Sequence, residues 1–207
     1  MNQKNSLGLD ACFMDLDDPL ELFKIWMSEA EKKEINDPDA LSLATTSKNN
    51  EPSVRMVLLK GLSQKGFVFY TNLNSPKSKD LKNNPKASMC FHWKSIQRQV
   101  RISGNVLQIA DKEADNYFNS RPYESKIGAW ASDQSKAMDT REEFLKKINE
   151  FKVKYKDKNN VPRPKYWSGW ILNPSIIEFW LGDEFRIHER LKYSKISNNW
   201  KKEILYP

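Results

Sequence analysis

Residues 40–71, "ALSLATTSKNNEPSVRMVLLKGLSQKGFVFYT", hold three short runs rich in aliphatic, β-branched and aromatic residues. Such runs are typical of strands, and only the polar turns 47–52 and 63–66 separate them. A parallel doubly wound sheet needs a helical crossover between successive strands, and no helix fits here. The stretch therefore predicts antiparallel strands.

The rest of the chain adds strands and helices around this stretch. Further strands are predicted at 86–93, 97–109, 166–172, 175–181 and 184–190. Helices are predicted from Asp18-Pro19 onward and over 75–84, 111–120, 125–135 and 141–157, the last with a Thr140–Glu143 capping box. This pattern favours a mainly β fold with added helices (α+β), built on an antiparallel barrel. We expect one domain over 18–207, preceded by a flexible segment 1–17.

Composition indicates a packed protein with an anionic partner. Of 207 residues, 39% are hydrophobic and 12% aromatic, whereas disordered chains are poor in both. The formal net charge of +7 favours nucleic acid, a membrane surface or phosphorylated small molecules as partners. A solvated, lysine-rich surface accounts for the charge equally well.

Several protein classes are disfavoured. Cys12 and Cys90 do not make a disulfide framework, and no apolar run has the length of a signal peptide core or a membrane span. Two scattered cysteines and two histidines do not suit a structural zinc site, and no glycine-rich nucleotide-binding motif is present. We therefore expect a soluble cytoplasmic protein.

Two groups of residues suit a phosphate. Ser75 and Pro76 fit the N-cap and first position of a helix, so Lys77 and Lys79 fall in its first turn, where an anion is favoured. In "YFNSRPYES", 117–125, the side chains of Tyr117, Arg121 and Ser125 are donors suited to phosphate oxygens. Each group alone is explained as readily by an exposed helix end.

Three strand segments carry polar faces. Alternation places Met56, Leu58 and Lys60 on one face of "RMVLLK", with Arg55, Val57 and Leu59 on the other. It also predicts a shared face for Gln97, Gln99 and Arg101, which suits the edge of a heteroaromatic ring. In "FWLGDEFRIHER", 179–190, a turn at Gly182-Asp183 leads to a strand with Arg186, His188 and Arg190 on one face, where like charges repel unless water or an anion lies there. Two phosphates with a flat ring between strands would account for all these groups.

The order of the motifs resembles one known family. The motifs are "RMVLLK", "FYTN", "RQV", "YFNSRP", "IGAWAS" followed by "QS", "IEFW", "RIHER" and the closing "LYP". They stand in the order found in pyridoxine (pyridoxamine) 5′-phosphate oxidases and cover roughly residues 18–207. The resemblance implies a split β-barrel that binds FMN at a homodimer interface. It also implies oxidation of pyridoxine or pyridoxamine 5′-phosphate to pyridoxal 5′-phosphate, with O₂ as acceptor and H₂O₂ as product.

The resemblance also implies roles for individual residues. The cofactor site would comprise Arg55, Met56, Val57, Leu58, Leu59, Lys60, Tyr70, Thr71, Lys77, Gln99, Gln134, Ser135, Trp180 and Arg190. Gln134 and Ser135 would come from the partner chain, and Lys77 would reach the FMN phosphate. The substrate phosphate would be held by Lys60, Tyr117, Arg121 and Ser125, while Arg186 and His188, the catalytic candidates, would face the substrate's pyridine ring.

Two departures from the family pattern bear on the site. Pro76 stands where the family commonly has an arginine that grips the FMN phosphate. The chain has no Arg before Arg55 and no Tyr before Tyr70, so it lacks the side chains with which the family's N-terminal segment often covers the substrate.

A split barrel that binds flavin or pyridoxal phosphate without turnover is one alternative function. A basic nucleic-acid-binding domain is another, disfavoured by the acidic residues of 141–157 and the lack of an aromatic RNA-binding pattern.

Overall fold

In the computed structural model, which describes residues 3–207, nine strands form one antiparallel sheet. The strands are β1 Ala40–Thr46, β2 Pro52–Leu58, β3 Gly61–Ser63, β4 Gly66–Asn72, β5 Lys86–Trp93, β6 Arg98–Gln108, β7 Trp167–Leu181, β8 Glu189–Ile196 and β9 Asn199–Leu205. Their order is β2-β1-β5-β6-β7-β4-β3, and β8 pairs with both β7 and β9. The antiparallel sheet predicted from 40–71 is confirmed.

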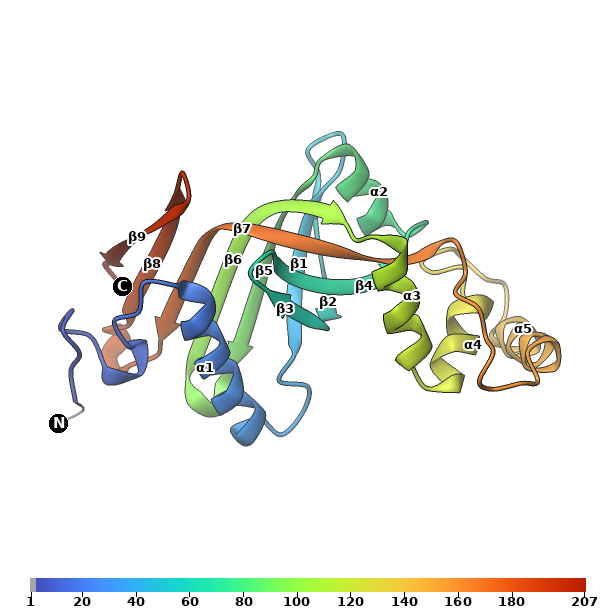
Figure 1. Ribbon diagram of the computed structural model, residues 1–207, viewed down its shortest axis with the longest axis horizontal. Coiled ribbons are helices and arrows are strands. Elements are labelled where there is room, and N and C mark those ends of the chain that lie inside the picture. The colour runs from blue at the N-terminus through green and yellow to red at the C-terminus, as the bar shows by residue number, and fades with distance from the viewer. Residues whose placement is uncertain (1–2) are drawn as a thin grey trace.

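Five helices and three 3₁₀ turns complete the described chain. The helices are α1 Pro19–Lys33, α2 Pro76–Asn83, α3 Asp111–Ser120, α4 Tyr123–Ala131 and α5 Arg141–Lys154; the turns are η1 Ala11–Phe13, η2 Lys94–Ile96 and η3 Glu184–Arg186. Helices α3, α4 and α5 gather at one end of the molecule, and the β8–β9 hairpin lies at the other (Figure 1). Across residues 3–207, none of these helices is both long and apolar enough to traverse a bilayer.

Strand β7 is continuous, whereas the sequence predicts two strands over 166–172 and 175–181. On one side its first part pairs with β4, up to Leu172, and its second part pairs with β8, from Ile176. Pro174 lies in the gap between these partners, so its missing N–H interrupts neither ladder. On its other side β7 approaches β6 closely at Gly104. A Cβ atom there would stand 2.0 Å from the Asn173 carbonyl oxygen, so only glycine fits this position. The strand therefore links the two ends of the molecule (Figure 1).

The main core lies between α1 and the sheet. Phe23 of α1 meets Phe67 and Phe91 edge to face, with ring centroids 4.9 and 5.1 Å apart, and Trp26 meets Phe179 at 5.1 Å. A second cluster under α3 and α4 includes Phe118, Ile127 and Trp167. Burial of these large side chains provides the main favourable free energy of folding.

The ends of some elements differ from expectation. The segment before α1 was expected to be flexible, but within residues 3–17 Phe13 is fully buried and the Cys12 carbonyl accepts a bond from Trp26 Nε1 at 2.7 Å. The helix predicted at 125–135 begins at Tyr123 and ends at Ala131, so the "DQS" residues lie in the following loop. At α5, Thr140 Oγ1 accepts from the Glu143 amide at 3.3 Å, which is the expected N-cap.

Candidate active site

A buried lysine lies where β4 leads into α2. Lys77 is 8% exposed, and its Nζ donates to Gln134 Oε1 at 2.8 Å, Thr71 Oγ1 at 3.2 Å and Ser75 Oγ at 3.3 Å. All three acceptors are neutral. Burial, with the nearby charge of Arg55, lowers the pKa of Lys77 to about 8. The ammonium group therefore sits where a bound anion would stabilise it.

Arg55 of β2 adds a second positive charge to this place. Its Nη1 donates to the Leu43 carbonyl at 3.0 Å and to Thr45 Oγ1 at 2.8 Å. Burial lowers the pKa of Arg55, and the charge of Asp80 opposes that shift. Within residues 3–207 no carboxylate forms an ion pair with Arg55 or Lys77. Both cations are therefore available to bind one phosphate group together. We refer to Arg55, Thr71, Lys77 and Gln134 as the anchor cluster.

Residues 56–59, in β2 and directly after it, were predicted to line the flavin and lie in two environments. Met56 and Leu58 are 63% and 38% exposed, while Val57 and Leu59 pack against the main core. Lys60, predicted to hold the substrate phosphate, forms an ion pair with Asp39 at 2.6 Å.

An aromatic wall with an arginine lies at the α3 end of the sheet. The rings of Tyr70 and Tyr117 stack with centroids 3.8 Å apart, and Tyr70 also stacks on Trp167 at 5.3 Å. The guanidinium carbon of Arg121 lies 4.6 Å from the Trp167 ring centre. Its Nη1 is buried with no hydrogen-bond partner, and burial lowers the pKa of Arg121. A buried donor without a partner costs stability, so this arginine is also suited to an anion.

The structure thus brings together Tyr117 and Arg121 of the four predicted substrate-phosphate residues. Ser125 lies in the first turn of α4, which begins at Tyr123. The sequence did not single out Trp167, which is the surface on which Tyr70 and Arg121 pack. Its signal was weak, because aromatic residues are frequent in strands and "YWSGW" contains three of them.

Another group of predicted residues lies at the opposite end of β7. Gln99, Trp180 and Arg190 are cross-strand neighbours on β6, β7 and β8. His188 lies against Trp180, with ring centroids 4.6 Å apart, and its Nδ1 accepts from the Asp183 amide at 3.1 Å. These residues and Arg186 are called the hairpin cluster.

Arg190 is held firmly in this cluster. It donates from Nε and Nη2 to Glu178 Oε1, at 3.0 and 2.8 Å, and from Nη1 to the Tyr206 carbonyl at 2.8 Å. Glu178 also pairs with Arg101. The sequence did not identify Glu178, although a single acidic residue within the apolar run "SIIEFWL" was a usable signal.

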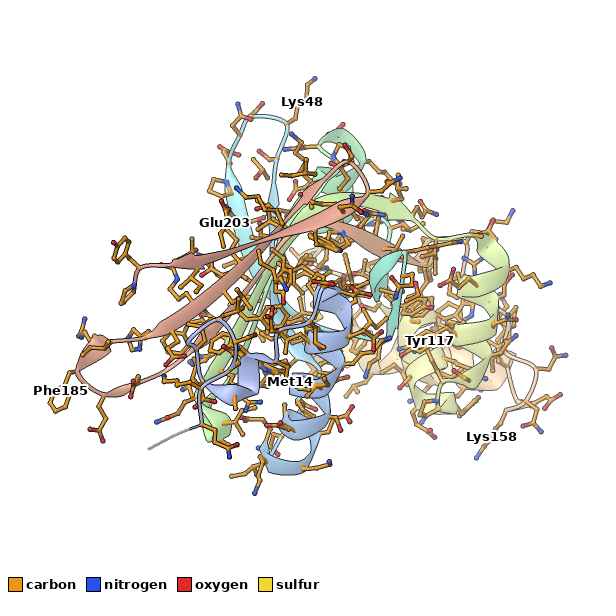
Figure 2. The ribbon with its side chains drawn as sticks, turned by 60° about the vertical axis from the view of Figure 1, so that its left-hand side comes forward. Met14, Lys48, Tyr117, Lys158, Phe185 and Glu203 are labelled. Atoms are coloured by element: carbon orange, nitrogen blue, oxygen red, sulfur yellow. The ribbon has the colours of Figure 1, made fainter. Side chains whose placement is uncertain are left out.

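The predicted strand over 184–190 is wrong in its first half. Residues 184–186 form η3, with left-handed φ values of 54° at Phe185 and 64° at Arg186, and β8 begins only at Glu189. Phe185 is 89% exposed and projects from the tip of the loop (Figure 2), so no packing holds this segment extended. Arg186 and His188 are therefore loop residues and do not share a strand face with Arg190.

A similar difference affects the start of β6. Gln97 has a left-handed φ of 54° and precedes the strand, so only Gln99 and Arg101 remain on the predicted face.

The anchor and hairpin clusters lie far apart within one chain. Thr71 pairs with Ser168 of β7, and Gln99 pairs with Trp180. Twelve residues of strand separate Ser168 from Trp180, which is about 40 Å measured along the strand. Thr71 and Trp180 thus lie at opposite ends of β7. Gln134, expected from a partner chain, lies beside Lys77 of its own chain.

Comparisons with known proteins cover almost the whole chain. A family model described as pyridoxamine 5′-phosphate oxidase matches residues 27–155. A second, described as the pyridoxine 5′-phosphate oxidase C-terminal dimerisation region, matches residues 167–207. The chain is 62% identical to a pyridoxine/pyridoxamine 5′-phosphate oxidase of Pelagibacter ubique over 208 residues, covering 100% of both chains. It is 48% identical to the enzyme of that name from Bartonella henselae, covering 98% of this chain and 99% of the relative.

Solved structures agree on the fold. The chain is similar to PhzG from Burkholderia lata, solved with tetrahydrophenazine-1-carboxylic acid, with a TM-score of 0.89, 28% identity and coverage of 95% and 96%. An FMN-binding protein related to pyridoxamine 5′-phosphate oxidase from Nostoc punctiforme aligns with a TM-score of 0.74 and 16% identity, covering 94% of this chain and all of that one. At that identity the second match supports the fold alone.

Proposed function

The chain belongs to the pyridoxamine 5′-phosphate oxidase family, and on that premise we propose that it makes pyridoxal 5′-phosphate. It would oxidise pyridoxamine 5′-phosphate and pyridoxine 5′-phosphate with FMN as cofactor, O₂ as acceptor and H₂O₂ as product. The observation that supports this most directly is the presence of two separate arginine or lysine sites whose charges have no carboxylate partner among the described residues. The reaction needs two phosphate anchors, one for the cofactor and one for the substrate.

The anchor cluster fits the FMN phosphate. Lys77 and Arg55 supply two positive charges, and Thr71 supplies a hydroxyl within 3.2 Å of Lys77 Nζ. A phosphate monoester carries a charge of about −1.5 to −2 at neutral pH, which would offset the desolvation of both cations. When bound, FMN supplies the hydride acceptor, which no side chain can provide.

The substrate phosphate would be held at the aromatic wall. Arg121 offers its unpartnered Nη1 there, and the Tyr117 hydroxyl adds a donor. Binding energy from this remote phosphate can orient the reacting carbon. Arg186 and His188 would orient the pyridine ring from the loop that precedes β8, with His188 oriented by its bond from the Asp183 amide.

Homodimerisation would bring these parts together. The segment that matches the dimerisation region, 167–207, contains most of the hairpin cluster. Because Thr71 of the anchor cluster and Trp180 of the hairpin cluster lie at opposite ends of β7, we propose that each site combines the anchor cluster of one protomer with the hairpin cluster of the other. On this proposal Trp180 and Arg190 would come from the partner, whereas the resemblance implied that Gln134 and Ser135 do.

Oxidase activity tests this function. Protein reconstituted with FMN is expected to consume O₂ and release H₂O₂ with pyridoxamine 5′-phosphate, and to do so far more slowly with unphosphorylated pyridoxamine at equal concentration. Oxygen uptake and peroxide formation are the measurements. Equal rates on both substrates would contradict the phosphate anchor, and flavin binding without turnover would favour the non-catalytic alternative.

Arg121→Ala is expected to raise KM for pyridoxamine 5′-phosphate without releasing FMN. The lost charged hydrogen bond should cost about 1.5–3 kcal/mol, or roughly ten- to a hundredfold in kcat/KM. Steady-state kinetics and the flavin content of the purified variant are the measurements. Arg141→Ala, at the exposed start of α5, is the matched control. Loss of flavin from Arg121→Ala would place this residue in the cofactor site instead.

Pro76→Arg is expected to strengthen FMN binding. Pro76 is exposed at the first position of α2, directly before Lys77, and the family commonly has an arginine there. The added charged contact should contribute about 1 kcal/mol, limited by loss of the rigid helix start. Titration of apoprotein by flavin fluorescence quenching at two salt concentrations measures the gain. An unchanged affinity would mean that the phosphate does not lie at this helix start.

A further inference from the structure

The N-terminal segment contacts the start of β8, immediately after the loop that carries Arg186 and His188. Lys4 forms an ion pair with Glu189, and the Asp10 amide donates to Glu189 Oε2 at 2.5 Å. Lys4 and Asp10 are joined by an isolated antiparallel bridge. Asn5 Oδ1 closes the turn between them by accepting from the Leu7 and Leu9 amides at 2.9 and 3.1 Å. The Glu189 carboxylate therefore binds both Lys4 and Asp10, the two ends of a small turn that is closed by its own hydrogen bonds.

The rest of the segment is tied to the body of the protein. Phe13 is buried against Trp26, with ring centroids 5.4 Å apart. The Leu16 carbonyl accepts from the Tyr193 hydroxyl at 2.8 Å. Lys202 of β9 forms ion pairs with Asp15 at 2.6 Å and Asp17 at 3.1 Å. Residues 3–17 are thus fixed to α1, β8 and β9, and Lys4 and Asp10 in their first part contact Glu189.

The loop itself has little to hold it in place. Phe185 and Ile187 are 89% and 65% exposed. Both Phe185 and Arg186 adopt left-handed backbone conformations, which residues with side chains keep only when their surroundings impose them. Inside the loop the Asp183 amide donates to His188, the Glu184 amide donates to Asp183 Oδ1 at 2.7 Å, and the Ile187 amide donates to the Glu184 carbonyl at 3.1 Å. The His188 ring also lies against Trp180. Apart from these local bonds and the contact of His188 with Trp180, the loop is held at its two ends.

Both ends of the loop are anchored. At the first end the Gly182 amide donates to the Gln97 carbonyl at 2.7 Å. At the second end stands Glu189, whose side chain is 16% exposed and is held by the N-terminal segment. The pKa of Lys4 is raised, first by its hydrogen bond to Glu189 and then by the charges of Glu189, Asp10 and Asp183. Lys4 thus interacts electrostatically with Asp183 at the first end of the loop and with Glu189 at the second.

We propose that residues 3–17 form a strap, fastened by Lys4 and Asp10 to Glu189, that holds loop 183–188 in the conformation in which Arg186 and His188 meet the substrate. Lys4 and Glu189 are positioning residues, because they act through the loop. The substrate part of this proposal rests on the proposed function, whereas the mechanical part does not.

The test compares loop exchange and kinetics in four variants of the FMN-loaded full-length protein. Lys4→Glu reverses the charge beside Glu189, Lys4→Arg preserves it, and Glu189→Ala removes the acceptor for both bonds. Lys24→Glu is the matched control, because Lys24 forms an exposed ion pair with Glu21 of α1 at 2.7 Å. Amide hydrogen exchange of peptides covering 182–190 is followed by mass spectrometry.

In Lys4→Glu and Glu189→Ala, we expect amide exchange of residues 183–188 to rise about tenfold, as expected for loss of a charged hydrogen bond. We expect kcat/KM for pyridoxamine 5′-phosphate to fall by about the same factor in both variants, with FMN content unchanged because Arg190 keeps its bonds to Glu178 and Tyr206. Lys4→Arg and Lys24→Glu should match the wild type in both measurements.

Unchanged loop exchange in Lys4→Glu and Glu189→Ala would overturn the strap. Faster exchange with unchanged kcat/KM would show that the loop does not position the substrate, and it too would overturn the proposal. If wild-type protein lacked oxidase activity, the exchange measurement would still test the strap. Failure of the proposed function and failure of the strap are therefore distinguishable.

Discussion

Lys77→Met is expected to abolish FMN retention during purification. Methionine keeps much of the volume of the buried stem but removes the ammonium group that bonds Gln134, Thr71 and Ser75. The phosphate would then meet a low-dielectric site with Arg55 as the remaining cation, and we expect the affinity to fall by roughly a hundredfold, or about 3 kcal/mol. Flavin content after gel filtration and titration of apoprotein with FMN are the measurements.

Lys82→Met is the matched control for this variant. Lys82 is exposed in the last turn of the same helix, so its loss changes net charge equally without reaching the anchor cluster. Retention of FMN by Lys77→Met, or an equal loss in both variants, would show that the phosphate is not held by Lys77.

The lowered pKa of Lys77 gives the same site a pH signature. Burial and the charge of Arg55 bring this pKa to about 8 in the protein without ligand, against an ordinary value of 10.5. Between these values the unfolded chain binds more protons than the folded one, so this residue makes apoprotein stability rise with pH. FMN favours the charged lysine, so its affinity should be nearly constant between about pH 7, where the phosphate is mostly doubly charged, and pH 8, and should decrease above it. Titrations from pH 7 to 9.5 would show that decrease in the wild type and not in Lys77→Met.

The sequence predicted those parts of the fold that depend on local chemistry. The predicted turns at 47–52 and 63–66 lie between β1 and β2 and between β3 and β4, whereas the short strand β3, Gly61–Ser63, was not predicted. The Asp18-Pro19 and Thr140 helix starts have side-chain caps on the amides of Leu20 and Glu143. In these cases the residues that specify the structure are neighbours in the chain, so propensity and capping rules suffice.

Features that depend on distant partners were not predicted. A proline at 174 argues for a break, and the sequence does not show that β7 changes neighbours there. Likewise, alternation of Arg186, His188 and Arg190 suggests a strand, but no second strand pairs with residues 184–188 and a 3₁₀ turn forms instead. The motif order suggested the candidate site residues without showing that they lie at opposite ends of β7. This placement is the basis of our proposal that two chains share each site.

Mixing two inactive variants is expected to restore activity, which tests this sharing. Lys77→Met damages the anchor cluster, and Arg190→Gln damages the hairpin cluster. If each site combines the two clusters from different protomers, a mixed dimer contains one site with both defects and one with none. Random pairing makes half of the dimers mixed, and each mixed dimer has one intact site of its two. About a quarter of all sites, and of the activity of an equal amount of wild-type protein, should therefore be restored. If one chain supplied both clusters, every site in the mixed dimer would be defective.

Co-expression with two affinity tags isolates the mixed dimer, and the measurements are flavin content and H₂O₂ formation with pyridoxamine 5′-phosphate. Arg190 bonds the buried Glu178, so Arg190→Gln can weaken folding; Arg186→Ala, in the exposed loop, serves as a second hairpin variant. Mixing Lys77→Met with the anchor variant Arg55→Gln is the control, because both defects lie in the same cluster and each site of that dimer keeps one of them. Two outcomes would contradict a site divided between the anchor cluster of one protomer and the hairpin cluster of the other. One is equal activity in this control and in the Lys77–Arg190 mixture, and the other is no activity in either mixture. Activity in the Lys77–Arg190 mixture alone is the result that the separation of the two clusters along β7 predicts.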